Sequence, residues 1–379
     1  MFSLGFAILI FMNIYVFIRG WQAVPAHFFP RILYMALYWL AAFSFFPSRY
    51  VETRFPPFLG KALTWIGSFW IVALIYFFLA VLFLDALRLA NHIRPFFPAA
   101  VLRNYPRAKY VTAIVILGVV GAVVLGGHIN SRIPRIRELE FSVDKKAGDL
   151  KKLDIVLLSD LHLGNIIGRS RLKKIVDKIN ALHPDVVLIP GDVVDRGVEP
   201  VIKENMGEEF ERIQSVYGVF ACAGNHEYFG SVEKASAYLN AHNVTVLRDS
   251  AVKVADAFYV IGREDRSAPR RGLARKGLKE LMDGMETKLP VIVLDHQPYD
   301  LGDTAAVGAD VQFSGHTHYG QFWPVNHIVK AIYEVAWGYK KIGNTHFYVT
   351  NGVGTWGPPV RVGNRPEIVH IRLNFQSRD

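Results

Sequence analysis

Five short apolar runs in the C-terminal two thirds of the chain each end in Asp, Asn or His residues. The most informative run, residues 185–190, predicts a buried strand that leads into Gly191, Asp192 and Asp195. The glycine lets other groups approach the carboxylates closely. Strands that share one sheet bring their carboxyl ends to the same edge, where α/β proteins bind ligands. The five runs therefore predict one site that is built from five strand ends.

The other four runs supply the remaining polar side chains of this predicted site. They end in Asp160 and His162, in Asn225 and His226, in His296, and in His316 and His318. Carboxylates, imidazoles and an amide oxygen suit a divalent ion such as Mn, Fe, Zn or Mg. These residues are too many for one tetrahedral site, and the single cysteine excludes a cysteine-based structural zinc. We therefore predict two divalent metal ions that share a bridging carboxylate, an arrangement that activates water and clamps a phosphoryl group.

Strand-like and helix-like segments alternate from residue 152 to the C-terminus. This alternation predicts an α/β sandwich flanked by helices. Residues 137–143 read as a strand that comes before it, and the Arg-rich segment 263–279 reads as a mobile basic loop that runs into a helix. The predicted helices cover residues 169–181, 203–216 and 231–242, and the further strands cover 244–247, 251–254, 258–261, 345–351 and 367–374.

Four apolar segments fill the N-terminal third and account for the hydrophobic content of 51%. They cover residues 2–18, 32–46, 62–84 and 111–127. Each has about the length that crosses a bilayer, although the second is shorter, ends at Pro47 and could be re-entrant. The first lacks the basic start of a signal peptide. We expect a bundle of about four transmembrane helices over residues 1–130, a connector with the first strand over 131–151, and the sandwich domain over 152–379.

The formal net charge of +10 fits basic loops beside anionic lipid better than a nucleic-acid partner, given the apolar segments. The loop charges favour a catalytic domain outside the cytoplasm, whereas the arginines after the last apolar segment, Arg132, Arg135 and Arg137, argue for the opposite side. We expect an integral protein of the cell (inner) membrane. The single cysteine, Cys222, excludes an intramolecular disulfide and reads as a buried strand residue.

The five polar blocks resemble the calcineurin-like metallophosphoesterase family and occur in that family's order. The blocks are Asp160-x-His162, Gly191-Asp192-x-x-Asp195, Gly224-Asn225-His226-Glu227, the His296 segment and Gly315-His316-x-His318. The closing segments 354–361 and 364–367 are similar to the bacterial membrane-anchored branch of the family. The resemblance implies the family's β-sandwich flanked by helices. Two features depart from the pattern: the anchor exceeds the single helix common in that branch, and Tyr319 stands where glycine is usual.

The resemblance also implies a role for each site residue. One metal ion would be held by Asp160, His162, Asp192 and His318, and the other by Asp192, Asn225, His296 and His316. A hydroxide between the ions would attack phosphorus. His226 would protonate the leaving oxygen, and Asp195 would orient its ring. Asn225 and Arg196 would contact the substrate phosphate, although Arg196 is equally well explained as a solvated charge at the rim.

The predicted function is that of a membrane-bound, metal-dependent phosphoesterase. Its substrate would be a phosphate ester or pyrophosphate, and the membrane anchor favours a lipid-linked compound such as a nucleotide-sugar lipid. The alternatives are a phosphoprotein phosphatase, a soluble phosphodiesterase, and a catalytically silent membrane protein that binds or senses metal. The presence of His226 and of every expected ligand argues against the silent protein. The sequence leaves the metal identity, the physiological substrate and the oligomeric state open.

Overall fold

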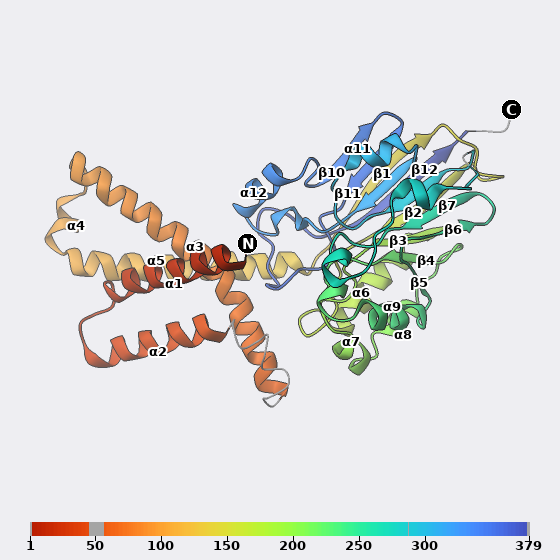
Figure 1. The fold of residues 1–379 in the computed structure, drawn as a ribbon. Coiled ribbons are helices and arrows are strands. Elements are labelled where there is room, and N and C mark those ends of the chain that lie inside the picture. Colours follow the sequence, from red (N-terminus) through yellow and green to blue (C-terminus); the bar gives the residue numbers. More distant parts are fainter. Residues whose placement is uncertain (1, 45–56, 287, 377–379) are drawn as a thin grey trace. The chain divides into compact units, whose positions relative to one another are not determined.

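The computed structural model describes residues 2–44, 57–286 and 288–376, and the chain forms two compact units (Figure 1). The helical unit contains residues 1–129 together with 357–360. The sheet unit contains residues 130–356 and 361–379.

The helical unit is built from the apolar segments. Its helices are α1 (Phe2–Trp21), α2 (Phe28–Ser44), α3 (Pro57–Ile93), α4 (Ala99–Arg103) and α5 (Tyr105–Ser131). By length and composition, two of them are able to cross a membrane, over Phe58–Ile93 and Tyr105–Ser131, whereas the apolar parts of α1 and α2 are shorter. Met12, Val16, Tyr38 and Leu74 pack together between α1, α2 and α3. The predicted end of the second segment, at residues 45–47, lies outside the described residues, and the number of spans stays a prediction.

The sheet unit is the predicted α/β sandwich. Its two six-stranded sheets have the strand orders β1-β12-β2-β3-β4-β5 and β10-β11-β9-β8-β7-β6. The first sheet contains β1 (Arg135–Val143), β2 (Lys152–Leu157), β3 (Val186–Pro190), β4 (Val219–Cys222), β5 (Val244–Leu247) and β12 (Glu367–Phe375). The second contains β6 (Ser250–Val254), β7 (Phe258–Gly262), β8 (Val291–Leu294), β9 (Val311–Ser314), β10 (Gly338–Ile342) and β11 (Thr345–Val349).

Buried side chains fill the space between the two sheets and the space beneath the helices. Leu157 and Leu188 of the first sheet pack against Val260 and Phe313 of the second. On the outer face of the first sheet, α6 (Arg169–Asn180) buries Leu172, Ile175, Val176 and Ile179, which is the spacing that predicted this helix. The remaining helices are α7 (Glu199–Lys203), α8 (Gly207–Glu211), α9 (Val232–Asn240), α10 (Leu278–Met282), α11 (Leu301–Ala306) and α12 (Val325–Ile332).

All five runs that were predicted to carry the site are strands, namely β2, β3, β4, β8 and β9. Strands β2, β3 and β4 are parallel neighbours, and β8 is parallel to β9. The carboxyl ends within each sheet therefore share an edge. The prediction that one sheet carries all five runs was wrong, because β8 and β9 belong to the second sheet, and the two sets of strand ends meet through the packing of one sheet against the other. Cys222 is buried in β4.

One local prediction was wrong. The helix predicted over 203–216 is two short helices, α7 and α8, because Asn205 between them adopts a left-handed backbone conformation (φ 48°) that ends the first helix. The Arg-rich segment 263–279 runs into helix α10, as predicted. Its mobility stays a prediction, and two of its residues are anchored, since the guanidinium groups of Arg263 and Arg275 both pair with the buried carboxylate of Asp295. Strand β10 and helices α11 and α12 were not predicted.

Candidate metal centre

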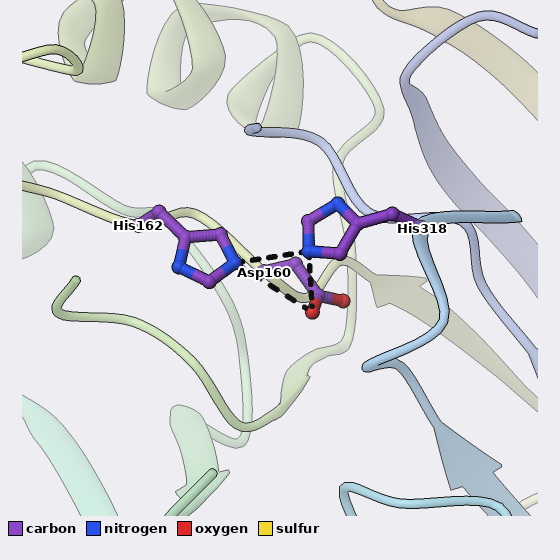
Figure 2. A group of neighbouring side chains, drawn as sticks. All are labelled: Asp160, His162 and His318. Atoms are coloured by element: carbon purple, nitrogen blue, oxygen red, sulfur yellow. Dashed lines mark hydrogen bonds and ion pairs between the residues drawn. The ribbon is translucent and has the colours of Figure 1, made fainter. Parts of the chain in front are cut away.

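Asp160, His162 and His318 form the first cluster of potential metal ligands (Figure 2). All three side chains are buried. His162 Nε2 lies 3.0 Å from His318 Nε2, and His318 Nε2 lies 3.2 Å from Asp160 Oδ1. Three potential ligand atoms therefore point at one small space between β2 and the loop that follows β9.

Asp192, His296 and His316 form the second cluster, and Asn225 completes it. Asp192 Oδ2 lies 3.2 Å from His296 Nε2. The Asn225 side-chain oxygen lies 2.7 Å from His316 Nδ1 and 3.2 Å from His296 Nε2. The four residues that the sequence assigned to the second ion are thus brought together from the ends of β3, β4, β8 and β9.

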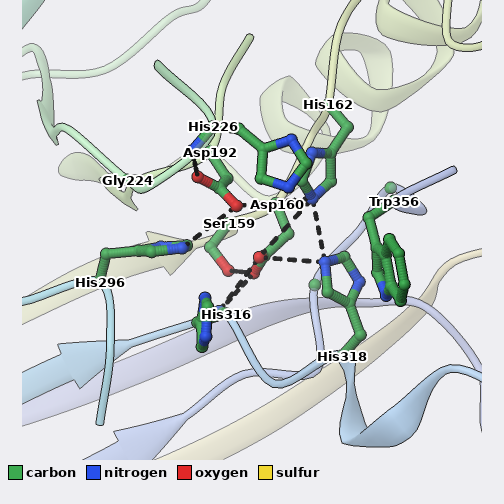
Figure 3. Close-up of polar contacts among 12 residues, drawn as sticks. Ser159, Asp160, His162, Asp192, Gly224, His226, His296, His316, His318 and Trp356 are labelled. Atoms are coloured by element: carbon green, nitrogen blue, oxygen red, sulfur yellow. Dashed lines mark hydrogen bonds and ion pairs between the residues drawn. The ribbon is translucent and has the colours of Figure 1, made fainter. Parts of the chain in front are cut away.

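Asp192 lies between the two clusters (Figure 3). The same oxygen, Oδ2, is 3.2 Å from His296 Nε2 of the second cluster and 3.7 Å from His162 Nε2 of the first. One carboxylate oxygen within reach of both clusters is what a bridging ligand of a two-metal site requires.

The backbone of the ligand loops is held in an uncommon conformation. Asp160, His162, Asp192, His316 and His318 all have positive φ angles, between 47° and 69°. Such residues cost free energy and cluster at functional sites, where the surrounding fold imposes them. The sequence contained no signal for this strain, since it comes from the tertiary structure.

Two glycines make room for the carboxylates. A Cβ on Gly224 would collide with Asp192, and a Cβ on Gly315 would collide with Ser159 and Asp160. Each glycine lies in the turn that carries the next ligand residue, Asn225 or His316. The Gly-Asn and Gly-His dipeptides therefore serve the close packing of loops from different strands.

Glu227 fixes the loops and points its carboxylate at backbone groups. Its oxygens accept hydrogen bonds from the backbone N–H groups of Asp192 (3.2 Å), Val194 (2.8 Å) and Gly224 (2.7 Å). Burial, with a further contribution from Asp192, raises the pKa of Glu227 to about 7. Glu227 thus stabilises the loops after β3 and β4.

His226 and Asp195 form the expected carboxylate–imidazole pair. His226 Nδ1 lies 2.9 Å from Asp195 Oδ1 and 2.6 Å from the Asp195 backbone oxygen. With Nδ1 donating to Asp195, the Nε2 atom of the same ring is the one that can exchange a proton with a substrate. His162, Asp195 and His226 also lie close enough together to ligate an ion, with His162 shared between this group and the first cluster.

The charges around His226 favour its protonated form. Burial alone would lower the pKa of His226, but the carboxylates of Asp192 and Asp195 outweigh it and raise the pKa to about 9. His226 therefore carries a proton at neutral pH, which a group that donates a proton needs.

The donor set fits divalent metal ions. Burial alone would raise the pKa of Asp160 and Asp192, but the facing imidazoles of His318 and His296, respectively, hold both pKa values below the ordinary range. Burial lowers the pKa of His316 to about 4 and that of His318 to about 3, so both rings are neutral, the form that binds metals. Asp192 raises the pKa of His296 against the effect of burial.

The residues around His296 orient its ring. His296 Nδ1 lies 2.8 Å from the backbone oxygen of Pro190, so that oxygen holds the Nδ1 proton and leaves Nε2 to face Asp192. The buried carboxylate of the neighbouring Asp295 pairs with Arg263 (3.0 Å) and Arg275 (2.6 Å).

Arg361 contacts the site, and its individual role was missed by the sequence analysis. Its guanidinium group is fully buried and donates hydrogen bonds to the backbone oxygens of Asn351 (2.7 Å) and Gly354 (2.8 Å). Arg361 Nη2 also lies 3.3 Å from His318 Nδ1. The only signal in the sequence was the position of Arg361 at the end of the 354–361 segment.

The remaining site residues lie toward the rim. Arg196 is exposed beside Asp195, and its contact with the substrate phosphate stays a prediction. Tyr319 is half-buried, has φ 49° and packs on the Trp337 ring with centroids 5.0 Å apart. The positive φ explains why glycine is usual at this position. Trp356 is 46% exposed and is drawn on the His318 side of the cluster in Figure 3.

The comparisons with known proteins agree with this geometry. The sequence profile described as calcineurin-like phosphoesterase matches residues 153–320. An uncharacterized metallophosphoesterase of Helicobacter pylori is 32% identical over 72% of this chain and 71% of its own length. The chain belongs to the calcineurin-like metallophosphoesterase family.

Other metallophosphoesterases in the family share the same region. A Danio rerio protein named transmembrane protein with metallophosphoesterase domain is 32% identical over 69% of this chain and 62% of its own length. An uncharacterized metallophosphoesterase of Campylobacter jejuni is 35% identical over 61% of this chain and 62% of its own length. The chain thus spans between 62 and 71% of the length of these three relatives.

Proposed function

We propose that this metallophosphoesterase hydrolyses a phosphate ester or pyrophosphate with two divalent metal ions in the buried clusters. The observation that carries the proposal is the position of Asp192 Oδ2, 3.2 Å from His296 Nε2 and 3.7 Å from His162 Nε2. Ions bound there would supply Lewis acidity toward the phosphoryl oxygens and a lowered pKa for water. The protein residues would hold the ions, orient the substrate and deliver a proton.

Each predicted site residue has a role in this proposal. The first ion would be held by Asp160, His162, Asp192 and His318, and the second by Asp192, Asn225, His296 and His316. His226 would give the proton on Nε2 to the leaving oxygen, with Asp195 fixing its ring. Asn225 and Arg196 would contact the phosphate. The contact of His226 Nδ1 with Asp195 Oδ1 at 2.9 Å supports this role, because it orients the ring and leaves Nε2 to face the leaving oxygen.

We further propose that the substrate is lipid-linked and that the protein belongs to the bacterial membrane-anchored branch of the family. Support comes from α3 and α5, two helices long and apolar enough to cross a membrane. Relatives from Danio rerio and Bos taurus are also named as transmembrane proteins with a metallophosphoesterase domain. An enzyme held at the bilayer meets lipid-borne esters at a high local concentration.

The activity can be tested with purified full-length protein that has been stripped of metal. Hydrolysis of bis-p-nitrophenyl phosphate and of p-nitrophenyl phosphate would be measured with Mn, Zn, Fe, Mg or no added metal. We expect metal-dependent turnover that Asp192→Asn abolishes and that Asp256→Asn, a change at a highly exposed carboxylate, leaves intact. Two bound metal ions without turnover of either ester would contradict the proposed activity.

The substrate class needs a second assay with the same preparation. Release of phosphate-containing product would be followed from vesicles that carry a lipid-linked pyrophosphate and, separately, from phosphopeptides. We expect turnover of the lipid only. The reverse pattern would contradict the lipid-linked substrate and would favour a phosphoprotein phosphatase.

A further inference from the structure

Helix α12 exposes apolar side chains close to the metal centre. Ile328 and Ile332, which lie four residues apart and therefore on the same side of the helix, are 60% and 56% exposed. Trp323, just before the helix, is 50% exposed. Three large apolar side chains on one short stretch of surface are typical of a site that meets another molecule or a membrane. We name Trp323, Ile328 and Ile332 the apolar ridge.

A pocket of about 370 Å³ with several arginines in its wall lies in the same unit. Arg135 and Arg137 line it from β1, where a spacing of two residues turns both side chains to the same face, and Arg365 lines it from the loop before β12. Trp337 also lines the pocket, and the guanidinium carbon of Arg137 lies 5.0 Å from the centroid of the Trp337 ring. We name these three arginines and Trp337 the basic pocket.

The wall of the basic pocket contains one carboxylate, Glu367, which accepts hydrogen bonds from neighbouring protein groups. Glu367 Oε1 accepts hydrogen bonds from Trp337 Nε1 (2.9 Å), the Tyr348 hydroxyl (3.1 Å) and the Asn351 backbone N–H (3.1 Å). Three guanidinium groups against one carboxylate leave the pocket with a positive charge. Planar guanidinium groups suit phosphate oxygens, so the expected ligand is an anion that carries a phosphate group.

The basic pocket and the apolar ridge are contiguous. Gly363 lines the pocket, and a Cβ built on it would lie 3.4 Å from Trp323 Cβ. The Trp323 backbone N–H also donates to the Val362 oxygen (2.9 Å). On the other side, Trp337 packs on Tyr319, and Lys330 of α12 lies over the Tyr319 ring at 5.3 Å. A phosphate in the pocket and an apolar phase at the ridge would therefore meet one continuous surface.

The chain leaves α5 at the basic pocket. Asn130, in the last turn of α5, lines the pocket and donates to the backbone oxygens of Arg361 (2.9 Å) and Asn364 (2.7 Å). Its side-chain oxygen accepts from Arg365 Nε at 3.0 Å. Because α5 is long and apolar enough to span a bilayer, its end would lie near the headgroups. This location favours a lipid surface over a peptide as the occupant.

We propose that the apolar ridge inserts into the interface of an anionic bilayer and that the basic pocket binds the phosphate of an anionic phospholipid headgroup. Apolar and aromatic side chains beside arginines form the usual pattern of an interfacial surface. The metal centre lies near the same surface, since Tyr319 directly follows the proposed ligand His318 and packs on Trp337. The proposal concerns membrane contact and does not depend on hydrolysis.

The test uses the full-length chain in nanodiscs and a fluorescent label at a single new cysteine. The one native cysteine, Cys222, is buried and will not compete for the label. Ala331→Cys places an NBD label on the exposed side of α12 and keeps the three ridge residues. Ala237→Cys is the matched control, because Ala237 is exposed on α9, which Figure 1 shows well away from α12. Nitroxide-labelled lipids serve as the quencher.

We expect the label at position 331 to lose fluorescence at least about twofold in discs of phosphatidylcholine with phosphatidylglycerol, whereas the label at position 237 stays unquenched. The double change Arg135→Gln and Arg365→Gln, at two exposed arginines, should reduce the quenching, as should discs of pure phosphatidylcholine. Inorganic phosphate at the concentration of the lipid phosphate should leave the quenching unchanged.

Three outcomes would overturn the proposal. Equal quenching at positions 331 and 237 would mean that α12 does not contact the bilayer. Loss of the phosphatidylglycerol effect when inorganic phosphate is added would assign the pocket to a free anion. Emission at position 331 that depends on protein concentration, without lipid quenching, would assign the ridge to a second copy of the chain.

Discussion

At the scale of single residues, strain and charge are concentrated at the same positions. Five of the proposed metal ligands have left-handed backbone angles. The two aspartates among them, Asp160 and Asp192, bury their carboxylates among imidazoles. Each left-handed residue costs about 1–3 kcal/mol, so the loops keep this shape only because surrounding contacts impose it. Glu227 and Arg361 supply such contacts through buried hydrogen bonds to the backbone.

His226→Ala should slow turnover by roughly 10²–10⁴-fold and leave the metal content unchanged, because the ring would donate a proton but not ligate. Metal analysis of the purified variant and hydrolysis of esters with good and poor leaving groups check this. The loss should be larger for the poor leaving group, which needs the proton more. Unchanged hydrolysis of a poor leaving group would contradict the role of His226 as a proton donor.

Arg361→Lys should lower the free energy of unfolding by about 3 kcal/mol, because a lysine cannot replace the several hydrogen bonds of a fully buried guanidinium group. Thermal unfolding of the full-length protein checks the effect. Arg270→Lys, at an exposed arginine, is the matched control and should leave the midpoint unchanged. Equal midpoints for the two variants would show that the contacts of Arg361 contribute little.

At the scale of elements, β12 holds the first sheet together. It pairs in parallel with β1 and antiparallel with β2, so the C-terminal strand lies inside the sheet. Arg372 of β12 lies directly opposite Asp154 of β2, and their side chains form an ion pair at 3.2 Å. Lys152 adds a second partner for Asp154 at 2.8 Å. This charge cluster joins β12 to β2, the strand that leads into Asp160.

Asp154→Asn should cost roughly 1 kcal/mol of stability near neutral pH, the usual size of a partly exposed cross-strand pair. Burial alone would raise the pKa of Asp154, but Lys152 and Arg372 outweigh it and lower the pKa. The stabilisation is therefore fully present above the ordinary aspartate value of about 3.9 and is lost as the pH falls through the lowered pKa.

Denaturant unfolding of the parent and the Asp154→Asn variant between pH 7 and pH 3 would measure this difference. The difference in the free energy of unfolding between the two proteins should be constant above about pH 5 and should disappear in acid. Asp283→Asn, at an exposed carboxylate, is the control. A difference in the free energy of unfolding that grows as the pH falls would contradict the sign of the pKa shift of Asp154.

At the scale of the whole molecule, the predicted spans of the helical unit would decide on which side of the membrane the sheet unit lies. The basic residues between the predicted spans favour a sheet unit outside the cytoplasm, although Arg132, Arg135 and Arg137 follow the last span directly. Arg135 and Arg137 have another explanation, because both line the basic pocket of the sheet unit. Their positive charge is therefore weaker evidence that the sheet unit lies on the cytoplasmic side.

Ala237→Cys should react with a membrane-impermeant maleimide in intact spheroplasts if the sheet unit lies outside the cytoplasm. Ala237 is exposed on α9, and the native Cys222 is buried, so the parent protein is the unlabelled control. Labelling that needs cell lysis would place the sheet unit inside and would contradict the predicted orientation.

Local sequence patterns were enough to predict the strands that lead into the site, the first helix of the sheet unit and the site itself. The apolar runs that end in Asp, Asn or His marked β2, β3, β4, β8 and β9 and located the metal centre, because strand periodicity and turn chemistry act over a few residues. The spacing of Leu172, Ile175 and Val176 predicted α6 in the same way. The apolar segments marked the helical unit.

Features that depend on long-range contacts became visible in the folded chain. The two arginines that pair with Asp295 come from positions 263 and 275. The hydrogen bonds of Glu227 likewise connect the loop after β4 with the loop after β3. The position of Asp192 between His162 and His296 depends on the packing of one sheet against the other. Helix α12 was not predicted, and only the fold shows that the side chains of Ile328 and Ile332 are exposed on it. These features follow from which loops meet in space, and chain order alone does not encode that.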